Sequence, residues 1–394
     1  MRAVASGSAV RNRLTSRTGA NDMAENCFVF GRWLLGGFFL LGLAGGGCRT
    51  IPDKGLSRPA SEVVVNGFNF GPRIRYGASP TANRGTPFVG GKLGTHGYYF
   101  RPSEKNGIVY TSHGGHIDTT HLRIAADWTA YLAARSYRHL MRGDPSFSFG
   151  LLADRSSHHV QISYPANWSS LAPEQRDPLA REVALALGPY LAYTMVTWHE
   201  ILTWYGYKST GLVPEFHSSF SWEDTFSNLL GTTIASKALR DPEHSYEQAV
   251  TLALEHELQT LGVQPAALSK WASQSVRGQW YAGRIGMFVE MKKRGLDIGV
   301  DTGVVTPLLV PDVPGCADAT PAAYPAPTLK ALADYGFTTV LEIEPHEWEK
   351  GKILRIVYPQ GGGHRIRPDA HFALIMNEIR QEAVVRYGPQ VASK

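Results

Sequence analysis

The chain has few cysteines and none of the common catalytic motifs. Cys27 and Cys48 lie near the N-terminus and Cys316 stands alone in the body, which excludes a disulfide or a zinc site built on several cysteines there. The GxSxG elbow, the P-loop and a GxGxxG turn before a helix are all absent. HExxH is absent too, because Thr203 stands where its second histidine would be. No motif therefore specifies a reaction.

Charged residues are also sparse, at 19% of the chain, and most of the excess positive charge lies at the N-terminus. Residues 1–47 hold five arginines against Asp22 and Glu25, a net charge of +3. The whole chain carries +5, so the remainder carries only +2 (+5 minus +3). A nucleic-acid-binding role thereby loses the basic surface that it needs. With 43% hydrophobic residues, the body can bury a large core and does not have the composition of a disordered chain.

Long hydrophobic runs are limited to residues 33–44, which read WLLGGFFLLGLA. This run follows Arg32 and precedes three glycines and Cys48. About a dozen apolar residues suit the core of a signal peptide and fall short of the ~20 that span a bilayer. Residues 1–47 are therefore predicted to be a signal segment, with Met23 as an alternative start that gives ordinary signal dimensions.

The end of this segment resembles the lipobox of bacterial lipoproteins, in which small residues precede a cysteine that is diacylated and becomes the mature N-terminus. Gly45 departs from the pattern, because the family usually has leucine there, although Leu43 lies two residues upstream. The resemblance implies a lipid on Cys48 that anchors the chain in a membrane; secretion without lipid and a cytoplasmic location are the alternatives. Arg49 is not the aspartate associated with inner-membrane retention, which favours the outer membrane, facing the periplasm.

The body is predicted to be an α+β domain with a helix-rich central core and short strands and hairpins at both ends. Residues 48–62 are polar and contain proline, as expected of a tether, and 63–394 form a single globular domain with a Pro-rich connection at 306–328. Strands are predicted within 63–110, as a hairpin at 147–164, and at 338–343 and 353–358. Helices are predicted from Asp118 to near Gly143, over 181–206 with a kink at Gly188-Pro189, and over 222–239, 245–261, 265–275 and 370–387, the last capped by Asp369.

Three segments carry side chains of the kind that bind metals or transfer protons. The first, 113–123, is a Gly-rich turn that leads into the helix capped by Asp118. His121 lies in the first turn of that helix, so His116, Asp118 and His121 can converge at the helix start. Metal binding, catalysis and anion binding at the helix N-terminus stay open beside a purely structural turn.

The second segment is Trp198-His199-Glu200, at the end of sixteen consecutive uncharged residues. Burying a carboxylate without a partner costs several kcal/mol, so Glu200 lies either at the surface end of its helix or paired inside the core. Adjacent helical residues differ by about 100° in direction. His199 and Glu200 therefore serve one site only if it lies between their two faces.

The third segment, 220–224, reads FSWED and leads into the next helix. Ser221 with Asp224 matches a capping box, and Glu223 in the first turn suits the helix dipole. Capping thus explains both acids without chemistry. It leaves unexplained why Asn228 and Gly231 weaken the apolar face of the same helix.

Together the segments SHGGHIDTTHLR, TWHEILTWYG and FSWEDTFSNLLG resemble a family of bacterial envelope lipoproteins known only as a domain of unknown function. The resemblance covers roughly residues 63–390. It implies an exported, lipidated protein and carries no established activity, so it assigns no role to any residue.

The sequence leads to the hypothesis of a hydrolase that acts on a component of the envelope with a divalent metal, zinc. Three protein ligands and one open position are the usual catalytic arrangement. The candidate metal ligands are His116, Asp118, His121 and His199, and the candidate catalytic carboxylates are Glu200, the general base, and Glu223. Peptidoglycan, a peptide or a lipid headgroup would be the substrate. The alternative is a non-catalytic scaffold or binding lipoprotein in which these groups form a buried polar network.

Overall fold

The computed structural model describes residues 57–391, apart from 76, 83–92, 101–102, 152, 209–214 and 284–288. The signal segment, Cys48 and the first part of the tether lie outside the described residues. The elements described below belong to one compact unit, Pro52–Lys394. None of the helices in this described part is long and apolar enough to span a bilayer.

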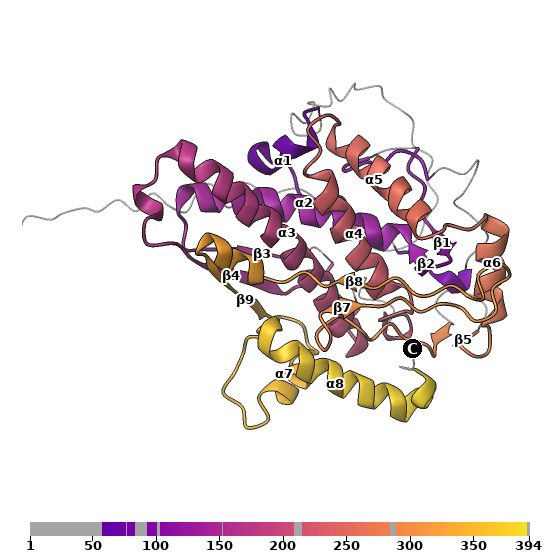
Figure 1. Ribbon diagram of the computed structural model, residues 1–394. Coiled ribbons are helices and arrows are strands. Elements are labelled where there is room, and N and C mark those ends of the chain that lie inside the picture. Colours follow the sequence, from indigo (N-terminus) through magenta and orange to yellow (C-terminus); the bar gives the residue numbers. More distant parts are fainter. Residues whose placement is uncertain are drawn as a thin grey trace, which may run out of the picture. The chain divides into compact units, whose positions relative to one another are not determined.

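Helix α2 (Thr119–Arg142) runs through the centre of the fold (Figure 1). Asp118 caps its N-terminus, since its side chain accepts a hydrogen bond from the backbone N–H of Thr120. Gly143 ends it with φ at 72°, the left-handed conformation that favours glycine. Both ends confirm the sequence prediction, because each is fixed by a local cap.

Helices α3 (Pro173–Trp204) and α4 (Asp224–Ala238) pack closely against α2. Glycine permits both contacts: a Cβ on Gly188 of α3 would lie 2.7 Å from the carbonyl oxygen of Thr129, and one on Gly231 of α4 would lie 2.1 Å from that of Leu122. Gly231 therefore brings the start of α4 against the start of α2. Helix α3 begins eight residues earlier than predicted, with proline in its first turn, and continues through Pro189.

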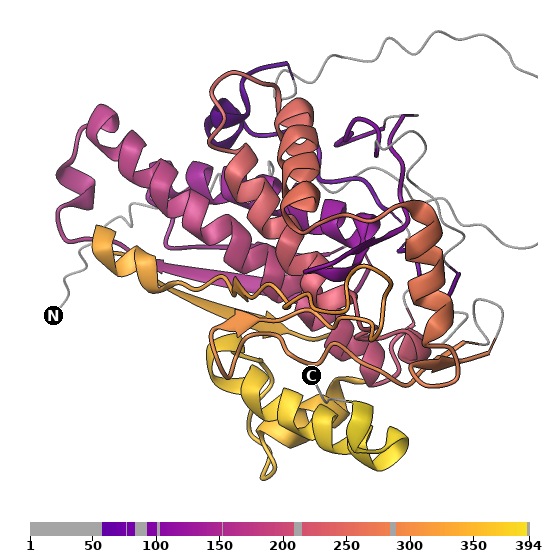
Figure 2. The ribbon, with the colours of Figure 1, turned by 45° about the vertical axis from the view of Figure 1, so that its right-hand side comes forward.

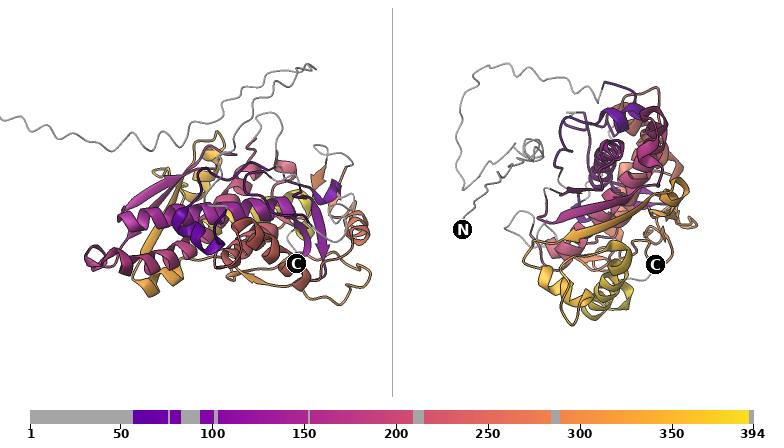
Figure 3. Two further views of the ribbon diagram at one scale, coloured as in Figure 1. Left: turned by 90° about the horizontal axis from the view of Figure 1, so that it is seen from above. Right: turned by 90° about the vertical axis from the view of Figure 1, so that its left-hand side faces the viewer.

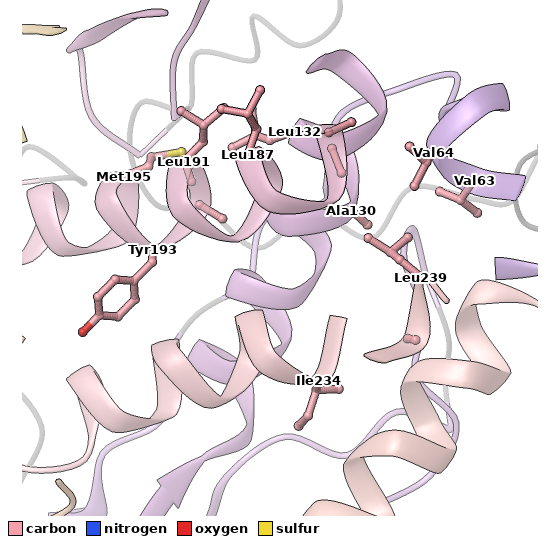
Figure 4. Packing of buried hydrophobic residues seen from close by; sticks show 14 of the residues in the cluster. Val63, Val64, Ala130, Leu132, Leu187, Leu191, Tyr193, Met195, Ile234 and Leu239 are labelled. Carbon is pink, nitrogen blue, oxygen red and sulfur yellow. The ribbon is translucent and has the colours of Figure 1, made fainter. Parts of the chain in front are cut away.

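The main hydrophobic core lies where these helices meet. Figure 4 shows Leu187 and Leu191 of α3 beside Leu132 of α2. Helix α1 (Ala60–Asn66) adds Val63 and Val64 to the same core. Three consecutive valines predict a strand by propensity, but here burial of two of them on a helical face decides the structure. The strand prediction was wrong at this run, and the tether ends before Ala60.

A three-stranded antiparallel sheet covers one side of the helices (Figures 2 and 3). Its order is β3 (Ser146–Phe149), β4 (Ser157–Ser163) and β9 (Thr338–Glu344). Val160 and Ile162 of β4 turn inward and their neighbours outward, the alternation that predicted this hairpin. The hairpin is confirmed, and β9 confirms the strand predicted at 338–343.

The C-terminal region corrects two predictions. Residues 353–358 fall mostly in helix α7 (Lys350–Val357), which buries Ile353 against α8 (Pro368–Tyr387). A short run rich in isoleucine and valine suits either structure, and tertiary packing decides here. Helix α8 is N-capped by Arg367, with Pro368 as its first residue, so Asp369 lies inside the first turn. Figure 2 shows α8 below the sheet.

The remaining elements are smaller and complete an α+β fold, as predicted. They are β1 (Ile108–Thr111), β2 (Gly115–Asp118), α5 (Tyr246–Thr260), α6 (Ala266–Ser275), β5 (Tyr281–Ala282), β6 (Glu290–Met291), β7 (Val304–Val305) and β8 (Tyr324–Pro325).

A buried ionic network fixes the segment that precedes the functional residues. Arg75 donates to Asp127 of α2 at 2.7 Å and to Glu104 at 3.0 Å, and His96 Nε2 lies 2.8 Å from Asp127. The neighbouring charges hold the pKa of Asp127 below its usual value, although burial alone would raise it. Gly77, two residues beyond Arg75, lies over the ring of His121: a Cβ there would be 2.9 Å from its Cε1. The network thus helps to position the chain that covers His121.

Candidate functional site

The candidate site begins at the junction of β2 and α2. Asp118 ends the strand and caps the helix, with Oδ1 accepting the N–H of Thr120 at 2.7 Å and Oδ2 accepting the N–H of Ala78 at 2.8 Å. Its own backbone N–H donates to Ser227 Oγ of α4 at 2.9 Å. One helical turn later, His121 Nδ1 lies 2.9 Å from Asp118 Oδ2. A carboxylate that accepts two backbone N–H groups, on a residue whose own N–H is also bonded, therefore faces an imidazole.

The first turn of α4 supplies the second carboxylate. Asp224 Oδ1 lies 3.2 Å from His121 Nδ1, while Asp224 Oδ2 accepts the backbone N–H of Ser221 at 2.8 Å. This last bond is half of the predicted capping box, but the helix begins at Asp224 and its N-cap position is Glu223. His121 Nδ1 thus lies between two carboxylate oxygens, one from each helix.

Helix α3 contributes Glu200, whose Oε2 accepts the backbone N–H of Phe220 at 2.8 Å. Phe220 is fully buried and has φ at 51°, a conformation that costs a side-chain-bearing residue about 1–2 kcal/mol. Arg294 stabilises this turn by donating to the carbonyl oxygens of Phe216 and Ser219, and Gly295 N–H donates to Phe220 O at 2.8 Å. The strained turn therefore presents an N–H group to the carboxylate of Glu200.

Glu223 completes the carboxylate cluster, as we call Asp118, His121, Glu200, Glu223 and Asp224. Its side chain is buried, and Oε2 accepts the hydroxyl of Ser221 at 2.6 Å. Its Oε1 is buried without a hydrogen-bond partner among the described residues. Buried carboxylate oxygens are rarely left in this state.

Burial and the neighbouring charges shift the pKa values of three residues of the cluster. Burial raises the pKa of Glu223 to about 8, with the charge of Asp118 acting in the same direction. Burial also raises the pKa of Asp224, as do the charges of Glu223, Glu200 and Asp118, while His121 opposes them. Burial acts to lower the pKa of His121, but Asp224 and Asp118 outweigh it and keep that pKa well above its ordinary value. Two carboxylates therefore contact the imidazole directly, and the charges of Glu200 and Glu223 act from further away.

His116, a predicted metal ligand, belongs to a different environment. Its Nδ1 accepts the indole N–H of Trp222 at 3.2 Å, and its Nε2 lies 2.9 Å from Ser273 Oγ on α6. Burial lowers its pKa to about 3, so the ring is neutral. Both ring nitrogens of His116 have partners within the protein, and the structure does not place His116 beside His121.

His199 also lies apart from His121. Its Nδ1 is 3.7 Å from Asp154 Oδ2, and its Nε2 is 4.0 Å from Glu215 Oε2. Glu200, the next residue, faces the carboxylate cluster, as expected from the 100° between adjacent helical positions. The three histidines therefore do not converge. Within the described part of the chain, no three His, Cys, Asp or Glu side chains form a ready-made metal site.

Of the predicted residues, the structure brings together Asp118, His121, Glu200 and Glu223. The sequence offered Asp224 as a helix cap and as the alternative to Glu223 in the expected convergence, and the structure makes it one of the two carboxylates nearest to His121. The sequence signal for it was Gly231, whose close contact with α2 brings the start of α4 to His121. Asp154 gave no recognisable signal, because it lies in a loop without periodicity.

Comparison with known families gives one match over this region. Residues 92–287 match the family described as "Protein of unknown function (DUF4056)". The matched range contains all five residues of the carboxylate cluster and is shorter than the 63–390 suggested by the sequence motifs. Searches of curated proteins and of solved structures give no match. The family description supplies no activity, so function has to be argued from the site.

Proposed function

We propose that the chain is a hydrolase of the bacterial cell envelope, with the carboxylate cluster as its catalytic centre. The observation that supports this best is the convergence of one imidazole and four carboxyl groups from three helices in a buried position. A structural network pairs each buried carboxylate with a cation or several donors, as Arg75 does for Asp127. Asp118 and Asp224 have donors of this kind, but Glu223 keeps one buried oxygen without a hydrogen-bond partner among the described residues. Such an arrangement costs stability and is typical of sites selected for chemistry.

The location in the envelope is part of the proposal and rests on the N-terminal sequence. The apolar run at 33–44 and the small residues before Cys48 support export and lipid attachment, and Arg49 supports the outer membrane, facing the periplasm. The membrane is then a partner through the lipid. Envelope polymers, peptides and lipid headgroups would be within reach of the site.

A divalent cation, zinc in the first instance, fits the charge of the cluster. His121, Asp118 and Asp224 are the nearest side chains of the right kind, and they would have to rearrange to hold it, because no three such groups among the described residues are arranged as a metal site. In the structure His121 Nδ1 lies at hydrogen-bond distance from the two carboxylate oxygens, 2.9 Å from Asp118 and 3.2 Å from Asp224, and loss of its proton would free it to bind a cation. When bound, such an ion would lower the pKa of a water molecule and supply the nucleophile.

The other two carboxylates would handle protons. Glu223 has a free, buried Oε1 and a raised pKa, which suits a group that accepts a proton from water and returns it to the leaving group of the cleaved bond. Glu200 is oriented by the N–H of Phe220 and is the alternative base. In either case the water oxygen bonds to the substrate's carbonyl carbon, and the leaving amine or alcohol takes the proton.

The test compares two histidines that the structure separates. The full chain is purified from bacterial membranes, its metal content is measured, and hydrolysis of peptidoglycan fragments, peptides and phospholipids is assayed. We expect about one divalent ion per wild-type chain, its loss in His121→Ala, and its retention in His199→Ala. A metal-free wild type that cleaves none of these substrates, with a strongly destabilised His121→Ala, would support the non-catalytic scaffold instead. That alternative has one observation in its favour, since the Arg75–Asp127–Glu104 network shows that this fold does use buried charges structurally.

A further inference from the structure

Three large apolar side chains are exposed on two short segments that pair with each other. Phe70 is 67% exposed, Ile74 is 60% exposed and Phe100 is 76% exposed. The segments are joined by hydrogen bonds from Tyr98 Oη to Phe70 O at 3.2 Å and from Arg73 Nε to Gly97 O at 3.2 Å. We call Phe70, Ile74 and Phe100 the apolar rim.

The backbone forces these side chains outward. Arg73 and Arg75 both reach Glu104, and Arg75 also donates to Gly97 O at 2.8 Å. In an extended segment successive side chains point to opposite sides, so Ile74, between the two arginines, points away from the buried network. Exposure of Ile74 is therefore a consequence of the ionic network and not of a loose loop.

The backbone that carries the rim is packed against buried side chains, although the rim side chains themselves are exposed to water. Phe68, two residues before Phe70, stacks on Tyr98 with ring centroids 3.9 Å apart, and Tyr98 is fully buried. Single exposed apolar residues are common on protein surfaces, but three on two paired segments indicate a surface with a partner. The fold thus stabilises the backbone beneath the rim and leaves the rim uncovered within the described residues.

The position of Cys48 in the sequence indicates which partner would cover the rim. Cys48 precedes Ser57, the first described residue, by nine positions, which limits its distance from Ser57 to about 30 Å. Phe70 follows Ser57 by thirteen residues, through the short helix α1. We propose that the apolar rim inserts into the leaflet that holds the lipid of Cys48, so that the body lies against the membrane instead of hanging from a free tether. This inference rests on the proposed lipid anchor.

The test places a polarity-sensitive fluorophore at the rim of the full-length protein purified from bacterial membranes. Phe100→Cys is combined with Cys316→Ser, the labelled protein is reconstituted in vesicles of phosphatidylethanolamine and phosphatidylglycerol, and lipids carrying a quencher report insertion. We expect a blue-shifted emission that is quenched from the lipid. The matched control is Trp348→Cys in the same background, because Trp348 is 92% exposed and comes from the turn between β9 and α7. Its emission should stay that of a probe in water.

A second measurement separates the surface from the anchor. In Cys48→Ser, which cannot carry the lipid, Phe70→Ser and Phe100→Ser should each lower partitioning into the same vesicles by about tenfold, while Trp348→Ser leaves it unchanged. The mass of the N-terminal peptide of the wild-type protein reports lipid attachment independently. A probe at residue 100 that stays in water, or one at residue 348 that inserts equally, would overturn the proposal even if Cys48 carries lipid.

Discussion

Replacing Glu223 by glutamine should stabilise the metal-free protein. Burial and the charge of Asp118 raise the pKa of Glu223 to about 8, whereas a glutamate in the unfolded chain has a pKa near 4.5. A carboxyl group whose pKa is raised by folding favours the folded state only while it is protonated. Stability is therefore lost as the pH rises from about 4.5 to about 8, and at pH 7 the loss amounts to about 3 kcal/mol. Glutamine is neutral at every pH and keeps an oxygen that can accept the hydroxyl of Ser221.

The assay is thermal unfolding of Glu223→Gln and wild type in a chelator, at several pH values between 4.5 and 8. We expect a higher midpoint for the variant at pH 7, by roughly 5 °C, equal midpoints near pH 4.5, and loss of any hydrolytic activity. Glu347→Gln is the matched control: Glu347 is equally buried but accepts hydrogen bonds from Arg155 N, Ser156 Oγ and His346 N. In Glu347→Gln the amide NH2 group would face these hydrogen-bond donors, so the midpoint of thermal unfolding should fall. Destabilisation by both substitutions would refute the assignment of Glu223 to a strained site.

Three further predictions concern other buried groups and the segment that covers His121. Asp127→Asn removes one of the two carboxylates that Arg75 contacts, and with it the charge that faces His96, and should lower the free energy of unfolding by about 3 kcal/mol, measured by urea denaturation. Burial lowers the pKa of His158 to about 3, so His158 is neutral in the fold and its contribution to stability is lost as the pH falls below about 6.5; His158→Phe should remove about 2 kcal/mol of the destabilisation between pH 7.5 and pH 5. Gly77→Ala brings a methyl group to within 2.9 Å of the His121 ring and should displace it, with a changed imidazole NMR signal and weaker metal binding but little change in the melting temperature. An unchanged signal would show that the segment moves instead of the ring.

The sequence predicts well the elements whose ends carry local signals. Asp118 and Gly143 delimit α2, and alternation over 157–163 delimits β4. The prediction fails where a short run of β-branched residues is compatible with both a helix and a strand, as in α1 and in α7. In both elements burial of one or two side chains against a distant helix decides the outcome, and that information is not local.

The candidate site divides in the same way. Acid and histidine residues at helix starts identified Asp118, His121 and Glu223, because each is next to a turn and a cap. The sequence could not tell which side of α3 faces α2, and this decides that Glu200 and not His199 enters the cluster. Nor could it show that Trp222 uses the Nδ1 atom of His116 as its acceptor. Pairings between helices depend on close contacts such as the one at Gly231, which only the folded chain displays.

Several local irregularities of this fold meet at the carboxylate cluster, and this coincidence is the main physical reason to look for function there. Some buried charges elsewhere are well paired: Asp127 contacts Arg75 and His96, and Glu347 accepts hydrogen bonds from several donors. Others, such as Asp154, have a buried oxygen without a hydrogen-bond partner in the described part of the chain. Around the carboxylate cluster it keeps a positive φ at Phe220, four carboxyl groups around one imidazole, and an unpaired oxygen on Glu223. Each of these costs stability. A chain that retains all three within a few residues of each other is more economically explained by a task performed at that point than by the needs of folding.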